Sequence, residues 1–371
     1  MSAVWRLLVD DGADAAGGLA LDEALMATYH RGQSEQPPTL RLYTYADHCA
    51  LVGRYQHLAA EVDLDACAEL GVAVNRRPTG GGAIIMGAGQ LGVAFVTAAP
   101  AAERPRQLLE RCSAGIVAGL AKIGLTATFR GKNDLQIDGR KVAGLGLYLD
   151  GSGGLLFHAS VLADLDVPTM LRVLRIPAAR LGEAAVAAVH RRITTVSRET
   201  REPWDGARLR QVVQLGFTEA LGVDLRPGMP SADETRHADA LRRDRYDDDA
   251  WRMRNTPQPD ATATATLRTP GGLLRVYLAL QGDVIKSALF TGDVNELPCE
   301  LTDLEAALKW QRLDPETLGA TLDAFYRATP VPDLPAETVA GALLEAGTRA
   351  TSHEVRAVPY RQGSCYFPEE T

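Results

Sequence analysis

The residues best suited to chemistry lie in two short clusters. The first, residues 76–83, places two arginines ahead of three consecutive glycines, Gly80, Gly81 and Gly82. Glycine lets the backbone approach a ligand closely, and its N–H groups can face an anion. The planar guanidinium of Arg77 adds a permanent charge that suits a phosphate or a carboxylate. The first cluster therefore predicts an anion-binding loop.

The second cluster, residues 131–144, surrounds an Asp-Gly turn that is typical of a β-hairpin. Asn133 and Asp134 stand at one end, and Lys141 and Gly144 follow the turn. Only five of the 39 basic residues are lysines, so the chain uses arginine as its general cation. Lysine is a compact point charge, and a glycine inside a strand often marks the close approach of a ligand. Lys141 is therefore a candidate for the cation at a reacting group.

Composition excludes several classes of protein. The net charge of −8 argues against a nucleic-acid partner, and the absence of a long apolar run argues against a membrane span. The N-terminus lacks the pattern of a signal peptide, so we expect a cytoplasmic protein, and we expect a monomer. The five cysteines show no CxxC or Cys/His spacing, which favours neither a disulfide framework nor a zinc site.

Hydrophobic periodicity predicts the elements that position these clusters. We expect strands over residues 4–10, 40–45, 50–53, 72–76, 93–96, 126–130, 134–137, 141–149 and 155–162. We expect helices over residues 14–31, 63–70, 104–123, 168–176 and 205–221. The polar, charge-rich stretch 228–262 is interpreted as a surface segment and linker.

A second unit follows that stretch, with strands expected over 261–267, 272–280 and 284–291 and helices over 301–309, 315–327 and 336–347. The fold class is therefore α+β: a large domain of mixed and antiparallel sheets flanked by helices, and a small α+β C-terminal domain. At 371 residues two domains are expected. We place a catalytic domain at 1–245, an accessory lid at 246–330, and an extension of unknown role at 331–371.

Residues 87–92 match the dinucleotide-binding pattern G-x-G-x-x-G. That pattern needs a helix directly after it, whereas residues 93–96 have the composition of a strand. We therefore interpret residues 87–92 as a connection between two antiparallel strands.

The order of the motifs resembles the lipoate–protein ligase A family, the long form within the biotin/lipoate protein ligase superfamily. The shared patterns are Arg-Arg-x-x-Gly-Gly-Gly-Ala, Gly-x-Asn-Asp-Leu, Gly-Arg-Lys-Val-x-Gly and His-x-Ser. Asp22-Glu23 and the run from Gly53 to Gln56 extend the resemblance, which covers about residues 4–330 and includes an accessory domain.

The resemblance implies an ATP-dependent ligase that activates lipoate as lipoyl-AMP and transfers it to a lysine of a lipoyl-acceptor protein, with ATP and Mg²⁺ required. Lys141 would contact both the lipoate carbonyl and the α-phosphate. The adenylate would be bound by Arg77, Gly80, Gly81, Gly82, Ala83, Ile84, Ile85, Asn133 and Asp134, with Asp134 also holding Mg²⁺. Lipoate would be bound by Gly53, Arg54, Gln56, Gly144, His158 and Ser160.

This chain departs from the family pattern after the glycines. Met86-Gly87 stands where the family has His-Asp, and Gln90 stands where an Asn is usual. A polar pocket edge has therefore become apolar, which leaves the choice between lipoate, octanoate and another acyl group open.

Three other functions stay open. The first is a lipoyl or octanoyl transferase of the same fold that uses an acyl carrier or acyl-AMP. A cysteine nucleophile would serve such an enzyme, but none lies in the motifs, and Cys49 suits a buried position. A biotin ligase is disfavoured because its basic Gly-Arg-Gly-Arg loop is absent. The third is a non-catalytic paralogue that binds a lipoyl domain or a nucleotide. The acceptor protein is not identified by the sequence.

Overall fold

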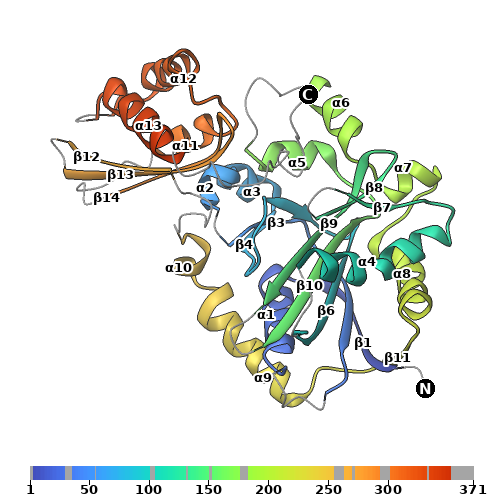
Figure 1. The fold of residues 1–371 in the computed structure, drawn as a ribbon. Coiled ribbons are helices and arrows are strands. Elements are labelled where there is room, and N and C mark those ends of the chain that lie inside the picture. The colour runs from blue at the N-terminus through green and yellow to red at the C-terminus, as the bar shows by residue number, and fades with distance from the viewer. Residues whose placement is uncertain are drawn as a thin grey trace.

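The protein is described by a computed structural model (Figure 1). It describes residues 3–29, 36–54, 56–100, 105–130, 133–149, 153–175, 183–254, 263–269, 272–292, 301–331 and 334–351. Gly131 and Lys132 of the second cluster and the stretch 352–371 lie outside the described residues.

An eight-stranded mixed sheet forms the centre of the larger unit, in the order β11-β1-β2-β6-β10-β9-β8-β7. β1 runs parallel to both β11 and β2, and the other neighbours are antiparallel. This mixed sheet confirms the α+β class. The bounds are β1 (Ala3–Ala13), β2 (Thr39–Tyr45), β6 (Gln90–Ala98), β7 (Thr128–Arg130), β8 (Asp134–Ile137), β9 (Arg140–Leu149), β10 (Gly154–Leu162) and β11 (Val223–Pro227).

The two faces of the large sheet are covered differently (Figure 1). Helices α4 (Pro105–Ala121) and α8 (Gly206–Leu221) pack on one face and form the main hydrophobic cluster with it. Helix α1 (Ala15–Met26) and a small sheet cover the other face. The small sheet has the order β4-β3-β5, with bounds β3 (Cys49–Val52), β4 (Ala73–Arg76) and β5 (Ile84–Met86). Arg77, Pro78 and Thr79 of the first cluster line a cavity on this second side, together with His158 and Ser160 of β10.

The interpretation of residues 87–92 as a connection between two antiparallel strands is wrong in part, because β5 belongs to the small sheet, β6 belongs to the large sheet, and the two strands do not pair. β5 ends at Met86 and β6 begins at Gln90, so a strand and not a helix follows the glycines. β2 and β10 flank β6 in an antiparallel arrangement. The dinucleotide interpretation is therefore correctly rejected.

The stretch 228–262 is more ordered than the sequence predicts, because helices α9 (Ala232–Leu241) and α10 (Asp249–Arg252) and the π-helix η2 (Arg242–Tyr246) occupy most of it. Ser231 and Glu234 form a capping box at the start of α9, a signal that was present in the sequence. Most of residues 228–254 are exposed, as a surface segment should be, but the segment is helical, and Tyr246 and Trp251 are buried in the hydrophobic cluster that contains α1.

Short helices complete the large unit beside the small sheet. They are α2 (Leu58–Glu61), α3 (Leu64–Leu70), α5 (Val167–Val173), α6 (Glu183–Arg192) and α7 (Val196–Thr200). Side chains from α2, α3, α5 and α6 form a separate hydrophobic cluster with β3 and β5. None of the helices in the described ranges combines the length and apolar composition needed to cross a bilayer.

Another hydrophobic cluster lies entirely beyond residue 262. It joins a three-stranded antiparallel sheet to helices α11 (Leu301–Leu308), α12 (Pro315–Ala328) and α13 (Ala336–Thr351). The strands are β12 (Ala263–Thr269), β13 (Gly272–Gln281) and β14 (Val284–Gly292). Because α13 shares this cluster, we propose an accessory unit that includes residues 263–351, with the boundary after α10.

Helices α4 and α8 approach each other through glycines. A Cβ placed on Gly216 would lie 2.1 Å from the carbonyl oxygen of Gly115 and 2.3 Å from the backbone nitrogen of Gly119. Both neighbours are backbone atoms, so a side chain at Gly216 must push the helices apart. This close contact holds α4 and α8 against the sheet face opposite the two clusters.

We expect Gly216→Ala to lower the free energy of unfolding by about 1–3 kcal/mol, the usual range for overpacking a close contact. Gly341→Ala in α13 is the matched control, because no atom lies within 4 Å of its added Cβ. The control should leave stability unchanged or raise it by up to about 1 kcal/mol. Urea unfolding of both variants measures this, and equal effects would contradict the close packing of α4 and α8.

Candidate active site

A single row of residues crosses five neighbouring strands on the sheet face that α1 and the small sheet cover. Strand register places Tyr43 of β2 beside Gly92 of β6, and Gly92 beside Ser160 of β10. Ser160 in turn pairs with Gly144 of β9, and Gly144 with Asp134 of β8. The sheet therefore brings predicted site residues from both ends of the hairpin onto one line.

Glycines in and beside this row leave room for neighbouring side chains. A Cβ on Gly92 would lie 2.3 Å from the ring of Tyr43, and one on Gly146 would lie 2.1 Å from Nε2 of His158. A Cβ on Gly144 would lie 3.0 Å from Nζ of Lys141. Three side chains that face the site thus lie over glycine backbone, which explains the glycines within these strands.

A β-bulge places Lys141 on this face. Asp134 pairs with Gly144 and Leu135 with Ala143, but Gln136 pairs with Lys141, so Val142 is the extra residue. Both Val142 and Ala143 enter the hydrophobic cluster on the opposite face. Without the bulge, strict alternation would point Lys141 into that cluster. Instead, its Nζ lies 2.7 Å from Oδ1 of Asp134.

The side chain of Arg77 binds the backbone of the glycine-rich loop. The Arg77 guanidinium is buried and donates hydrogen bonds to the carbonyls of Leu51 (3.0 Å), Gly80 (2.8 Å) and Gly82 (2.7 Å). Gly81 has a φ of +95°, which favours glycine. We propose that Arg77 shapes the loop, and its contact with a phosphate stays a prediction.

A narrow cavity of about 30 Å³ lies between this loop and the sheet row. Apolar side chains and Tyr43 form most of its wall, and the polar residues of the wall are Asp22, Arg77, Thr79, His158 and Ser160. The Oγ1 of Thr79 and the Nε2 of His158 are buried without a hydrogen-bond partner among the described residues. Buried polar atoms are normally paired, so these two mark a place where a polar ligand group fits. The lining residues are Leu19, Asp22, Tyr43, Leu51, Arg77, Pro78, Thr79, Ile84, Met86, Leu156, His158, Ala159 and Ser160.

Met86 explains part of the departure from the family pattern. Its side chain is buried in the cavity wall, and its Sδ accepts a hydrogen bond of 2.8 Å from the hydroxyl of Ser160. Ligand pockets usually hold several hundred Å³, so an acyl chain requires this cavity to widen. Methionine is unbranched and adaptable, and we propose that Met86 moves to make room.

A buried ion pair reaches the wall of the narrow cavity through Asp22. Asp22 is buried there, and burial raises the pKa of its carboxyl while the charge of Arg41 opposes that rise. The buried Arg41 guanidinium donates to Asp22 (2.6 Å) and also pairs with Asp10. Its guanidinium carbon lies 4.1 Å from the ring centroid of Tyr43. This buried ion pair holds Asp22 and Tyr43 in their places in the cavity wall.

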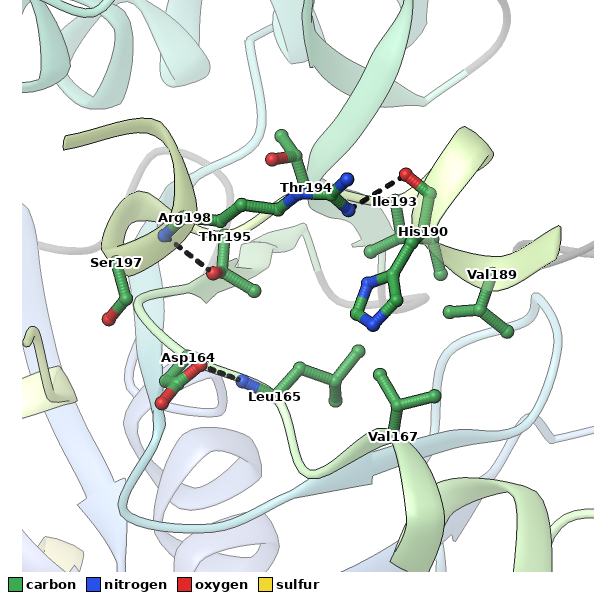
Figure 2. Close-up of a pocket in the computed structure, with 10 residues that line it drawn as sticks. All are labelled: Asp164, Leu165, Val167, Val189, His190, Ile193, Thr194, Thr195, Ser197 and Arg198. Atoms are coloured by element: carbon green, nitrogen blue, oxygen red, sulfur yellow. Dashed lines mark hydrogen bonds between the residues drawn. The ribbon is translucent and has the colours of Figure 1, made fainter. Parts of the chain in front are cut away.

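A larger cavity of about 310 Å³ is lined in part by Ile193 and Thr194, which lie beside the backbone of Lys141. Figure 2 shows the imidazole of His190 projecting into it, beside Val189 and opposite Leu165. The segment that closes it pairs with the strand of Lys141, since the N–H of Thr194 donates to the carbonyl of Lys141 over 2.9 Å. The lining residues are Asp164, Leu165, Val167, Val189, His190, Ile193, Thr194, Thr195, Ser197 and Arg198.

The predicted site residues lie in different places in the structure. Arg77, Ile84, His158 and Ser160 line the narrow cavity, and the Lys141–Asp134 pair lies along the row of Gly144 and Ser160. Ala83 and Ile85 point instead into the hydrophobic cluster of the short helices.

The remaining predicted residues do not line the narrow cavity. They bind neighbouring backbone and side-chain groups. Asn133 uses its amide to donate to the carbonyl of Leu145 (2.9 Å). Gly53 lies beneath the carbonyl of Gly81, its N–H donates to Oε1 of Gln56 (2.9 Å), and Arg54 donates to the hydroxyl of Tyr148 (3.2 Å).

Sequence reasoning missed Thr79, Tyr43 and Gly146. Thr79 lies inside the Arg-Arg-x-x-Gly motif, so its place beside the glycines was the available signal. Tyr43 and Gly146 gain their roles only from strand register. The site therefore draws on more strands than the motifs alone indicate.

The metal-binding capacity of the site is limited. No group of three metal-ligating side chains exists among the residues that the structure describes. Asp134 supplies one carboxylate, and it already faces Lys141. Mg²⁺ typically binds one or two carboxylates together with substrate phosphates, so Asp134 could serve as a protein ligand only alongside a bound nucleotide.

The described cysteines are unsuited to nucleophilic catalysis. Cys49, Cys67 and Cys112 are all buried. Burial raises the pKa of the Cys49 thiol well above its usual range, which disfavours the reactive thiolate. None of the three lines either cavity. Cys299 and Cys365 lie outside the described residues.

The burial of His158 predicts how the stability of the folded protein depends on pH. Burial, with a smaller contribution from the charge of Arg77, lowers the pKa of His158 to about 3 from 6.5. The unfolded chain therefore takes up a proton between these values that the folded protein does not. Stability contributed by a neutral His158 is fully present above pH 6.5 and is lost as the pH falls.

We expect His158→Gln to reduce the loss of unfolding free energy between pH 7 and pH 4.5, because glutamine does not titrate. His237→Gln, at an exposed position on α9, should leave that loss unchanged. Urea unfolding at the two pH values measures both variants. An identical pH dependence in wild type and His158→Gln would show that His158 is not held neutral by burial.

Comparison with known proteins identifies the family. Residues 14–218 match the lipoyl protein ligase A/B catalytic domain. Octanoyltransferase LipM from Symbiobacterium thermophilum is 31% identical over 279 residues, covering 68% of this chain and 100% of the relative. LipM from Kyrpidia tusciae is 30% identical over 275 residues, covering 67% of this chain and 98% of the relative.

Solved structures agree with this match. A bi-partite lipoate protein ligase from Thermoplasma acidophilum, studied with its E2 lipoyl domain, has a TM-score of 0.62 at 25% identity and covers 70% of this chain and 99% of its own. A lipoate-protein ligase A bound with ATP has a TM-score of 0.59 at 25% identity, covering 69% and 100%. A T. acidophilum protein with bound lipoic acid has a TM-score of 0.58 at 25% identity, covering 68% and 99%. The chain therefore belongs to the lipoyl protein ligase A/B catalytic domain family, as the glycine, Asn-Asp and lysine motifs indicated.

Proposed function

We propose that this protein transfers a medium-chain acyl group, octanoyl or lipoyl, to a lysine of a lipoyl-acceptor domain. The observation that carries this proposal is the narrow cavity between the glycine-rich loop and the sheet. Its wall is mainly apolar, and two of its lining residues, Thr79 and His158, each carry a buried polar atom without a hydrogen-bond partner among the described residues. This combination suits an acyl chain whose polar carbonyl end lies near Lys141.

The relatives favour octanoyl transfer, since both are named octanoyltransferases. In such a step the amine of the acceptor lysine attacks the carbonyl carbon of an octanoyl thioester. A C–N bond forms, the C–S bond breaks, and the carrier thiol leaves with a proton from the amine. The oxygen of the carbonyl becomes negative on the way, and Lys141 could stabilise it.

A second route, ATP-dependent ligation, is favoured by specific features of the structure. The cavity of about 310 Å³ beside Lys141 has room for a nucleoside. The described cysteines are also buried away from both cavities, so a covalent thioester on them is disfavoured. In this route a carboxylate oxygen attacks the α-phosphorus of ATP and pyrophosphate leaves. The acceptor lysine then displaces AMP.

The Lys141–Asp134 pair is common to both routes. Asp134 holds the Nζ of Lys141 on the row that Ser160 and Gly144 form. A buried or half-buried lysine that is held in one place needs little reorganisation when charge develops nearby. We therefore propose Lys141 as the catalytic residue, with Asp134 as its positioning partner and, in the ligase route, as the ligand for Mg²⁺.

We expect Lys141→Ala to slow acyl transfer by about 10²–10³-fold, the usual scale for removing one preorganised donor at an oxyanion. Lys122→Ala is the control, because Lys122 pairs with Glu219 on the outer side of α4 and α8. The rate is followed by intact mass of a lipoyl-acceptor domain. If Lys141→Ala transferred the acyl group at the wild-type rate, Lys141 would not be the catalytic residue.

A three-donor assay separates the routes. The protein and acceptor domain are incubated with octanoyl-carrier thioester, with octanoyl-AMP, or with octanoate, ATP and Mg²⁺. Acylation from the thioester supports the transferase, and acylation with pyrophosphate release supports the ligase. Acylation from octanoyl-AMP alone supports a transferase that needs the activated acyl group. No acylation from any donor, nor from the matching lipoyl donors, would contradict the proposal.

The larger cavity gives a further prediction for nucleotide use. We expect His190→Trp to fill it and to suppress acylation from octanoyl-AMP and from ATP, while acylation from the thioester persists. His190→Ala is the matched control and should support every donor that the wild type accepts. If His190→Trp used octanoyl-AMP as well as the wild type does, the larger cavity would not be the nucleotide-binding site.

A further inference from the structure

Arg76, the neighbour of Arg77, is buried in a set of backbone carbonyls. Its exposed fraction is 0%, and none of its hydrogen bonds within the described residues goes to a carboxylate. The guanidinium donates to the carbonyls of Gly53 (3.0 Å), Arg54 (3.1 Å), Gln56 (2.6 Å), Trp251 (3.0 Å) and Arg252 (2.9 Å). We call these five acceptors the carbonyl cage.

Burying a charge without a counter-ion costs free energy, so the burial of Arg76 in the carbonyl cage needs a structural or functional explanation. Burial, together with the charge of Arg254, lowers the pKa of Arg76 to about 10. The side chain is therefore still protonated at neutral pH. Only arginine offers five N–H donors in one plane, which lets one side chain bind carbonyls from two separate segments.

The two segments have different neighbours. On one side, the pocket loop (Gly53, Arg54 and Gln56) supports the narrow cavity. The N–H of Arg54 donates to the carbonyl of Thr79 over 2.8 Å, and Gly53 packs beneath the carbonyl of Gly81. Thr79 carries one of the two unpaired polar atoms of the cavity. A shift of the pocket loop would therefore move a cavity wall.

On the other side, α10 precedes the accessory unit. The indole Nε1 of Trp251 donates back to the carbonyl of Arg76 over 2.9 Å. The accessory unit also contacts the residues that follow the pocket loop, because Glu305 pairs with His57 and Lys309 pairs with Glu61. Pocket loop, α10 and accessory unit thus form a continuous chain of contacts around Arg76.

We propose that Arg76 is a positioning residue that couples the placement of α10 and the accessory unit to the shape of the acyl cavity. This inference rests on the proposed acyl transfer for its functional meaning. It does not require Arg76 to contact a substrate, since every donor atom for which a bond is described binds protein backbone. The cage acts through the pocket loop on Thr79 and Gly81.

The test uses Arg76→Lys, which keeps the charge but cannot reach both segments, and Trp251→Phe, which removes only the indole donor. Hydrogen–deuterium exchange is measured in peptides covering 50–62 and 246–254. We expect exchange to rise in both peptides together, more in Arg76→Lys than in Trp251→Phe. Where Arg76→Lys does not fold, Trp251→Phe decides the outcome.

The kinetic arm compares octanoyl and hexanoyl donors. We expect kcat/KM for octanoyl transfer to fall by about 10²-fold in Arg76→Lys, the scale for misplacing a site by about 1 Å, and to fall less for the hexanoyl donor. Arg6→Lys is the matched control, since Arg6 is a largely buried arginine paired with Glu234 away from the cavity. It should lower stability without changing the octanoyl-to-hexanoyl ratio or exchange at 50–62.

The proposal would be overturned if Arg76→Lys lowered only the overall stability, as Arg6→Lys is expected to do. A rise of exchange in only one of the two peptides would overturn it as well. The exchange arm needs no activity, so an inactive wild type would refute the proposed function while the coupling is still decided by exchange.

Discussion

The site depends on the absence of side chains at Gly92, Gly144 and Gly146 on one face of the large sheet. Each glycine lies beneath a larger side chain from an adjoining position: Tyr43, Lys141 and His158. A methyl group at Gly92 or Gly146 would occupy the space of the covering ring. Because protein interiors are close-packed, such a ring could not move aside without disturbing its own neighbours. The glycines therefore set where the cavity floor lies, and the bulge at Val142 aims Lys141 along that floor.

The two adjacent arginines act on opposite sides of the glycine-rich loop. Arg77 turns inward and binds the carbonyls of Gly80 and Gly82, which holds the loop in shape over the cavity. Arg76 turns the other way and binds the pocket loop and α10. Arg76 is the last residue of β4 and Arg77 follows it. Because their guanidinium groups bind different segments, one dipeptide can fix both the roof of the cavity and its surroundings. All the hydrogen bonds described for these two guanidinium groups go to backbone carbonyls.

The sequence predicted the α+β class, the strand that follows residues 87–92 and the motifs of the family, because these depend on local composition and spacing. It placed Asp134 and Lys141 on either side of a turn, but it could not show the bulge, since Val142 and Ala143 suit either face. The charge run at 242–249 contains one buried aromatic, Tyr246, and a second, Trp251, follows it closely. The run of charges concealed the helices between the two units. The partners of Thr79 and Arg76 depend on contacts between distant segments, which no local pattern encodes.

The central claim is that the acyl group lies in the narrow cavity with its carbonyl at Lys141. A crystal structure of the protein with a non-hydrolysable octanoyl-adenylate analogue tests this most directly. We expect the octanoyl chain between Met86 and Tyr43, with the carbonyl or the adjoining phosphate surrogate in hydrogen-bond contact with Lys141 Nζ. A chain bound outside this cavity, or a carbonyl beyond the reach of Lys141, would contradict the claim.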